Sequence, residues 1–133
     1  ACAAAREHHF AAVVSYATFV PLMSDLLRGC DVKTCAVIDF PGGFSTPAER
    51  AQEADRAVAE GADELDVVMN YRQMLTGDFK GVRDDLVRVV RAVRGSRGKL
   101  RICPPLFLHE RGSDRFCAKA DAINNGLASL FGD

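Results

Sequence analysis

The sequence predicts an α/β fold built on a parallel sheet, and three observations lead to this prediction. Short apolar segments of strand type alternate along the chain with longer segments of helical periodicity. A helix over 46–60 opens with a capping pattern, and a continuous apolar stripe runs through 78–94. Strands that alternate with helices form parallel sheets with right-handed crossovers. Both a doubly wound sheet and a (β/α)8 barrel fit this alternation.

The first 30 residues predict the end of a helix, a strand and a second helix. Residues 1–9 are rich in alanine and are typical of a helix tail, and 11–15 lie in a short buried-strand pattern. From 19 to 28 apolar side chains recur at helical spacing, and Gly29 ends this helix. The inward positions are Val20, Met23 and Leu27.

A second strand is predicted over 33–38, and it leads through a loop over 39–45 into the helix over 46–60. The loop carries two adjacent glycines, which either let the backbone approach a ligand or form a plain turn. The helix begins with Thr46 as N-cap, Pro at its first position and Glu49 three residues after the cap. Its expected inward residues are Ala51, Ala54 and Val58.

The central strand is predicted over 64–68, and it contains one carboxylate, Asp66. Because a strand alternates its faces, Leu65 and Val67 share one face and Asp66 lies on the other. If helices cover the first face, Asp66 points to the opposite side of the sheet. Burying an unpaired carboxylate is costly, so such a residue is paired, protonated or functional. A structural Asp tied to a neighbouring strand or loop is the alternative.

The remaining elements are a turn-rich connection over 71–76, a helix over 78–94 and a strand over 99–103. The helix carries an apolar stripe of Phe79, Val82, Leu86, Val89, Val90 and Val93. Its other face is charged and is expected to be solvated, with Lys80, Arg83, Asp84, Asp85, Arg88, Arg91 and Arg94.

Composition excludes several classes of protein. The 133 residues have the size of one domain, and 48% hydrophobic with 26% charged residues is typical of a globular chain. A net charge of −1 does not favour nucleic acid or an anionic membrane as partner, and no apolar run reaches the length of a membrane span. Five cysteines without a C-x-x-C pair predict reduced thiols in a cytoplasmic protein, and we expect no metal or other cofactor.

Residues 61–72 (Gly-Ala-Asp-Glu-Leu-Asp-Val-Val-Met-Asn-Tyr-Arg), followed by Leu-Thr-Gly-Asp at 75–78, resemble the central signature of class I deoxyribose-phosphate aldolases. Four upstream segments are similar to the same family in the same order: 10–13, 19–22, 26–29 and 35–43.

The resemblance covers about residues 2–102 and implies the second to fifth units of a (β/α)8 barrel. We therefore expect a partial TIM barrel, about half of one, over 1–103. The expected second part is a divergent tail over 104–133, helical from about 114.

The resemblance also implies a reaction, the reversible cleavage of 2-deoxyribose 5-phosphate to acetaldehyde and glyceraldehyde 3-phosphate. A lysine forms a Schiff base with the substrate carbonyl, and an inward Asp assists proton transfer. Asp66 matches that Asp within its motif.

The family's Schiff-base lysine has no match. The four lysines of the chain are Lys33, Lys80, Lys99 and Lys119, and Lys119 lacks the Thr-Ser-Thr-Gly that follows the family's lysine. Arg101 stands where the family carries another lysine, and the substrate-binding residues stay unassigned. We therefore expect a truncated and inactive member of an aldolase family that acts on a phosphorylated sugar. The alternative is a non-catalytic half-barrel that associates with itself or with a partner chain.

Overall fold

The computed structural model describes residues 1–93 and 99–103 of the chain, and for 99–103 it describes the backbone. The tail predicted over 104–133 and the end of the 78–94 helix lie outside the described residues. The elements in chain order are α1 (Cys2–Glu7), β1 (Ala12–Tyr16), the 3-10 turn η1 (Ala17–Phe19), α2 (Val20–Leu26), β2 (Lys33–Ile38), α3 (Pro47–Ala59), β3 (Glu64–Val68), α4 (Tyr71–Thr76), α5 (Phe79–Ala92) and β4 (Lys99–Cys103).

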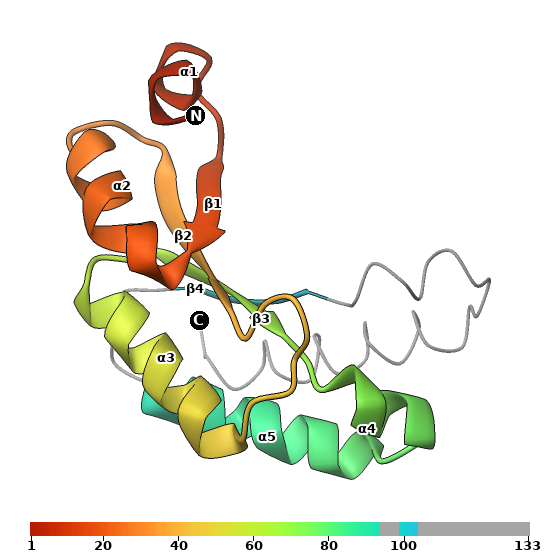
Figure 1. The fold of residues 1–133 in the computed structure, drawn as a ribbon. Helices are drawn as coiled ribbons and strands as arrows, with labels where there is room; N and C mark the ends of the chain where they lie inside the picture. Colours follow the sequence, from red (N-terminus) through yellow and green to blue (C-terminus); the bar gives the residue numbers. More distant parts are fainter. Residues whose placement is uncertain (94–98, 104–133) are drawn as a thin grey trace.

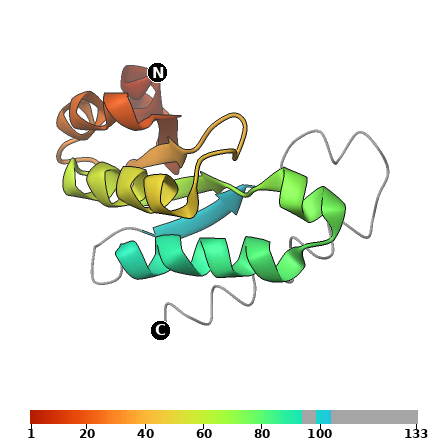
Figure 2. The same ribbon diagram turned by 60° about the horizontal axis from the view of Figure 1, so that its bottom comes forward.

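The four strands form one parallel sheet in the order β1-β2-β3-β4, which confirms the predicted α/β fold (Figure 1). Their pairing is in register, so that one row across the sheet contains Tyr16, Val37, Asp66 and Arg101. Helices α3 and α5 lie side by side along one side of the sheet (Figure 2). This is the arrangement of consecutive units of a (β/α)8 barrel.

The core lies between the sheet and these helices. From β3 it takes Leu65 and Val67, so the predicted division of this strand into two faces is confirmed. The predicted inward side chains of α2, which are Val20, Met23 and Leu27, are also buried. The helices α3 and α5 contribute Ala54, Ala57, Val82, Leu86, Val89 and Val90.

The start of α3 has the predicted capping box. The Oγ1 of Thr46 accepts from the amide of Glu49 at 3.3 Å, and the carboxylate of Glu49 accepts from the amide of Thr46 at 2.8 Å. These two bonds satisfy donors that a helix start leaves without partners. Of the three residues expected to face inward, Ala54 is buried, whereas Ala51 and Val58 are half-buried.

Two predictions about local structure were wrong. Residues 71–76 form the helix α4 and not a turn, because Asn70 caps it by accepting from the amide of Gln73 at 3.2 Å and Met74 is buried beneath it. The sequence predicts Asp85 on the solvated face of the helix over 78–94, but its side chain is buried. Its carboxylate is paired inside the protein with Arg50, which offsets the cost of burial.

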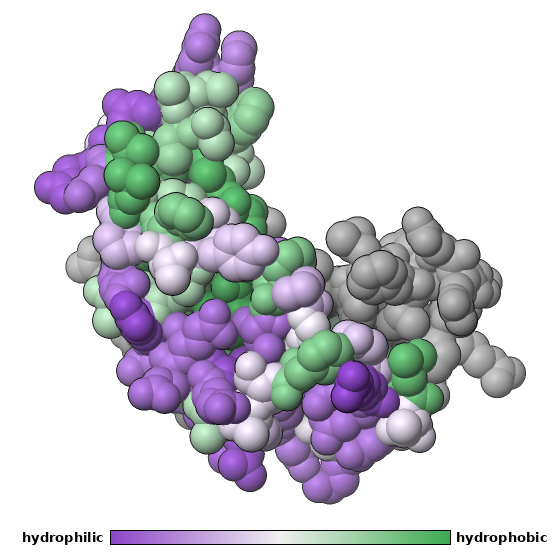
Figure 3. All heavy atoms as spheres, in the orientation of Figure 1, coloured by the Kyte–Doolittle hydropathy of each residue, from purple (hydrophilic) through white to green (hydrophobic). Residues whose placement is uncertain are grey.

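The opposite side of the sheet is more open. Val14 and Tyr16 on β1 are about half exposed, and they alternate with Val13, which packs on the core. Figure 3 shows apolar side chains on the surface formed by α1, β1 and α2, whereas the surface over α3 is mainly hydrophilic. In the described part of the chain, β1 pairs only with β2, so it is an edge strand.

Candidate functional site

Asp66 lies in the middle of β3 on the face away from the helices. It is half-buried, its strand neighbours Leu65 and Val67 point into the core, and it interacts with other groups of the chain. In the register of the sheet it stands next to Val37 on β2 and Arg101 on β4. The structure thus puts a carboxylate on the sheet face that is the interior of a (β/α)8 barrel.

The loop over 39–45 follows β2 at the carboxyl edge of the sheet, where active sites of such barrels lie. Asp39 has a positive φ of 58°, and its carboxylate accepts from the amide and the hydroxyl of Ser45, the latter at 2.8 Å. The amide of Gly43 donates to the carbonyl of Asp39 at 2.8 Å. The loop is therefore folded on itself and is not a simple turn.

This loop rests on the end of β3. A Cβ atom at Gly43 would lie 2.2 Å from the carbonyl oxygen of Met69 and 3.2 Å from the side chain of Val68. No other residue type fits this approach, because real Cβ atoms do not come so close to backbone. The sequence left two interpretations of the glycine pair, close approach to a ligand or a plain turn. The structure shows another role for Gly43, which is close approach of the loop backbone to the end of β3.

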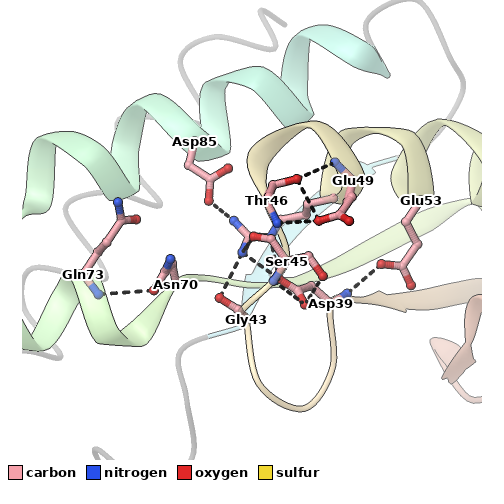
Figure 4. Close-up of polar contacts among 10 residues, drawn as sticks. Asp39, Gly43, Ser45, Thr46, Glu49, Glu53, Asn70, Gln73 and Asp85 are labelled. Atoms are coloured by element: carbon pink, nitrogen blue, oxygen red, sulfur yellow. Dashed lines mark hydrogen bonds and ion pairs between the residues drawn. The ribbon is translucent and has the colours of Figure 1, made fainter.

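A buried arginine joins this loop to the helices. Arg50 on α3 has a fully buried side chain, and its Nε and Nη2 donate to Oδ2 of Asp39 at 2.9 and 2.6 Å. Its Nη1 forms an ion pair with Asp85 of α5. Figure 4 shows Asp39 and Asp85 on separate elements, both directed to the region between the loop and α5. One cation thus pairs with two carboxylates and lowers the cost of burying each of them.

Sequence reasoning missed this cluster, although a signal was present. Asp85 follows Val82 by three residues and precedes Val89 by four, so it belongs to the same helical face as the apolar stripe. Arg50 likewise precedes the buried Ala54 by four residues. Charged residues at inward helical positions, one of each sign, indicate a buried pair.

Aromatic side chains surround the carboxyl edge of the sheet. Tyr16 and Phe40 meet edge to face with their ring centroids 5.8 Å apart, and Phe44 lies 5.0 Å from Tyr71. The guanidinium of Arg72 lies 4.4 Å above the ring of Phe44. Tyr16, Phe40 and Phe44 are each about half exposed, so they are available to a ligand or a partner as well as to one another.

The lysines that the structure places lie away from this edge. Lys33 is exposed at the first position of β2, and Lys99 is the first residue of β4, so both lie at the amino end of the sheet. Lys80 on α5 donates to Asp84 at 2.6 Å, and this hydrogen bond and charge raise the pKa of Lys80. A Schiff-base lysine needs a lowered pKa, so Lys80 is unsuited to that role. Lys119 lies outside the described residues.

Residues 1–93 and 99–103 contain no group of three His, Cys, Asp or Glu side chains placed to hold a metal ion. Within the same ranges, no helix combines the length and the apolar character needed to cross a membrane.

Comparison with known proteins gives a consistent result. No protein-family profile matches the chain. Curated proteins named deoxyribose-phosphate aldolase are 34% to 44% identical to it, and the one from Streptococcus suis is 44% identical over 90 residues, 68% of this chain and 41% of that relative. The chain spans between 40% and 55% of the length of the curated relatives it matches.

Solved structures agree with the curated relatives. A candidate deoxyribose-phosphate aldolase from Coccidioides immitis has a TM-score of 0.77 and 29% identity, over 98% of this chain and 48% of that chain. The tetrameric deoxyribose phosphate aldolase from Aeropyrum pernix has a TM-score of 0.67 and 25% identity, over 76% of this chain and 42% of that chain.

Proposed function

The chain belongs to the deoxyribose-phosphate aldolase family, and we propose that it retains the proton-transfer group of that family's site without its nucleophile. Asp66 is that group. The 133-residue chain then carries a recognisable part of an aldolase barrel, but by itself it does not cleave the sugar phosphate.

The proposed role of Asp66 follows from the chemistry of imine aldolases. A neutral lysine attacks the carbonyl of 2-deoxyribose 5-phosphate, and the protonated imine accepts the electron pair when the carbon–carbon bond breaks. The proton that moves on and off the substrate carbon needs a nearby acid and base, and a carboxylate with access to water performs this task. A half-buried carboxylate on the inner face of the sheet suits that role.

The observation that carries the proposal is the separation of Asp66 from the three lysines that the structure describes. Asp66 lies within the sheet, whereas Lys33 and Lys99 begin their strands and Lys80 is paired on the outer helix. Covalent catalysis of this kind needs the nucleophile and the proton-transfer group within reach of the same bound substrate. Loss of a catalytic nucleophile removes several powers of ten in rate, whatever remains of the site.

A second candidate function is a non-catalytic half-barrel that associates with itself or with a partner chain. The observation that favours it is β1, an edge strand in the described part of the chain, with Val14 and Tyr16 about half exposed beside the edge. Exposed apolar edges promote pairing with another chain. The relative from Aeropyrum pernix is a tetramer, so the family includes oligomers. The reduced thiols predicted from the cysteines support a location of the protein in the cytoplasm.

A cleavage assay tests the proposed function. The chain is incubated with 2-deoxyribose 5-phosphate, and release of acetaldehyde is followed beside the Streptococcus suis relative at equal concentration. We expect cleavage no faster than in a protein-free sample, and no difference between the wild-type chain and Asp66→Asn. Turnover that Asp66→Asn abolishes would show that this chain has a complete site and would contradict the proposal.

A further inference from the structure

The loop over 39–45 is attached to the rest of the protein mainly through one side chain. Arg50 donates to the carboxylate of Asp39 at the start of the loop, to the carbonyl of Gly43 in its middle at 3.0 Å, and to the carbonyl of Ser45 at its end at 3.4 Å. Figure 4 shows these three loop residues gathered around the same point. A single guanidinium has five donors in a fixed plane, so it can hold several points at once.

Arg50 is also fixed by a contact on the side away from the loop. Its side chain is fully buried, and its ion pair with Asp85 ties it to α5. The Asp85 side chain is 4% exposed, so solvent does not screen this pair as it would a surface pair. The anchor of the loop is therefore part of the α3–α5 layer and not part of the sheet.

The other attachments of the loop are weaker or cover only part of it. Glu53, also on α3, accepts from the amide of Asp39 at 3.0 Å and holds the first residue alone. Phe40 and Phe44 contact Tyr16 and Tyr71 through rings that stay about half exposed. Asp39 is not a glycine and has a positive φ of 58°, so the start of the loop keeps an unusual backbone that needs support from its surroundings.

We propose that Arg50 is a positioning residue that latches the loop over 39–45 onto the carboxyl end of β3. With the latch closed, Gly43 lies against Met69, three residues beyond Asp66. With the latch released, the loop lifts from the end of β3 while the sheet and its helices stay folded. The latch controls access to the carboxyl edge beside Asp66, and it operates whether or not the chain is catalytic.

Amide hydrogen exchange on the full chain tests the latch. The amides of Gly43 and Ser45 donate to Asp39, and Arg50 holds the carboxylate of Asp39 in place, so the exchange rates of these amides report loosening of the loop when the latch is lost. In Arg50→Met we expect these two amides to exchange about tenfold faster or more, since several charge-assisted hydrogen bonds are lost. The matched control is Arg56→Met on the same helix, which removes an exposed pair with Glu60 and leaves the loop contacts unchanged.

The sheet provides the internal reference. The amides of Ala36 and Leu65, in β2 and β3, are expected to exchange in Arg50→Met at rates within about twofold of those in Arg56→Met, because exchange through local opening leaves the sheet protected. Equal acceleration of loop and sheet amides would mean that Arg50 supports only the stability of the whole fold. No acceleration of the loop amides would mean that other contacts hold it. Either result overturns the proposal.

A double variant covers the case in which Arg50→Met does not fold. Arg50→Met/Asp85→Leu exchanges the ion pair between α3 and α5 for apolar side chains, which is often tolerated. The Asp39 carboxylate also loses Arg50, but it lies on the loop and reaches solvent when the loop lifts. We expect wild-type exchange for Ala36 and Leu65 in this variant, and loop amides that remain about tenfold faster. Wild-type rates at Gly43 and Ser45 would overturn the latch.

Discussion

Gly43 lies against Met69 so closely that a Cβ atom at position 43 would come within 2.2 Å of the Met69 carbonyl oxygen. The loop after β2 and the end of β3 are thus in backbone contact at the carboxyl edge of the sheet. Through Asp39 and Arg50 the same loop is joined to α3, and through Asp85 to α5. This edge of the half-barrel is held together by one glycine contact and one buried cation.

Gly43→Ala is expected to destabilise the chain more than Gly29→Ala does. Both glycines have positive φ, of 63° and 78°, which costs alanine about 1–2 kcal/mol at either site. A Cβ at Gly29 meets nothing within 4 Å, whereas at Gly43 it meets backbone. The difference between the two free energies of unfolding in urea measures the contact. Equal losses would mean that the loop shifts away from Met69 without cost.

Asp85→Ala is expected to lower the free energy of unfolding by about 1–3 kcal/mol, because it leaves Nη1 of Arg50 buried without its acceptor while Asp39 still balances the charge of the guanidinium. The neighbouring Asp84→Ala is the control. Asp84 pairs at the surface with Lys80, whose side chain is 85% exposed, so its loss should change stability little. Chemical denaturation of the three proteins gives the comparison. Similar midpoints for both variants would show that the Asp85 pair contributes no more than a surface pair.

The fold could be predicted from the sequence because its signals are local. The alternation of strands with helices, the cap at Thr46 and the stripe from Val82 to Val93 depend on residues close together in the chain. The face of Asp66 followed in the same way from strand periodicity. The alignment of Asp66 with Tyr16 and Arg101 in one row across the sheet could not be predicted in this way, because register depends on how separate strands pair.

The buried cluster gives a weaker signal, because the inward helical positions of Arg50 and Asp85 do not show that the two side chains meet. Arg50 and Asp85 are 35 positions apart, and each by itself looks like one more charged residue on a charged helix. Their burial depends on the packing of α3 against α5. Helix α4 was missed for another reason, since six residues between a cap and Gly77 give too few turns for a periodic signal. The catalytic role of Asp66 stays a prediction.

The start of α3 should lose stability in acid in a way that depends on Glu49. Hydrogen bonds from the side chain and then the backbone of Thr46 hold the pKa of Glu49 below its ordinary value of 4.5. A carboxylate with a lowered pKa in the folded state stabilises the fold above the ordinary value, and this contribution is lost as pH falls through the lowered value. Melting temperatures of wild type and Glu49→Gln from pH 7 to 3 test this. We expect the wild-type advantage to shrink below pH 4.5. A difference in melting temperature that stays the same from pH 7 to 3 would contradict this prediction.

Self-association through the open edge is expected at high protein concentration. Val14 is 49% exposed on the edge strand β1, and a lysine at such a position disfavours edge pairing. Val14→Lys should therefore give a lower mass by light scattering than the wild type. Leu75→Lys, at a 54% exposed position on α4, should leave the mass unchanged. A compact wild-type monomer with a cooperative melt would count against this account.

Trapping of an imine tests the central claim most directly, namely that the chain keeps the proton-transfer carboxylate of an aldolase but not the nucleophile. The chain and the Streptococcus suis relative are incubated with acetaldehyde and borohydride, which reduces an imine to a stable amine, and are digested for mass spectrometry. We predict a stoichiometric adduct on the relative and only trace, unselective modification of this chain. A stoichiometric adduct on one lysine, Lys99 or Lys119 above all, would contradict the account.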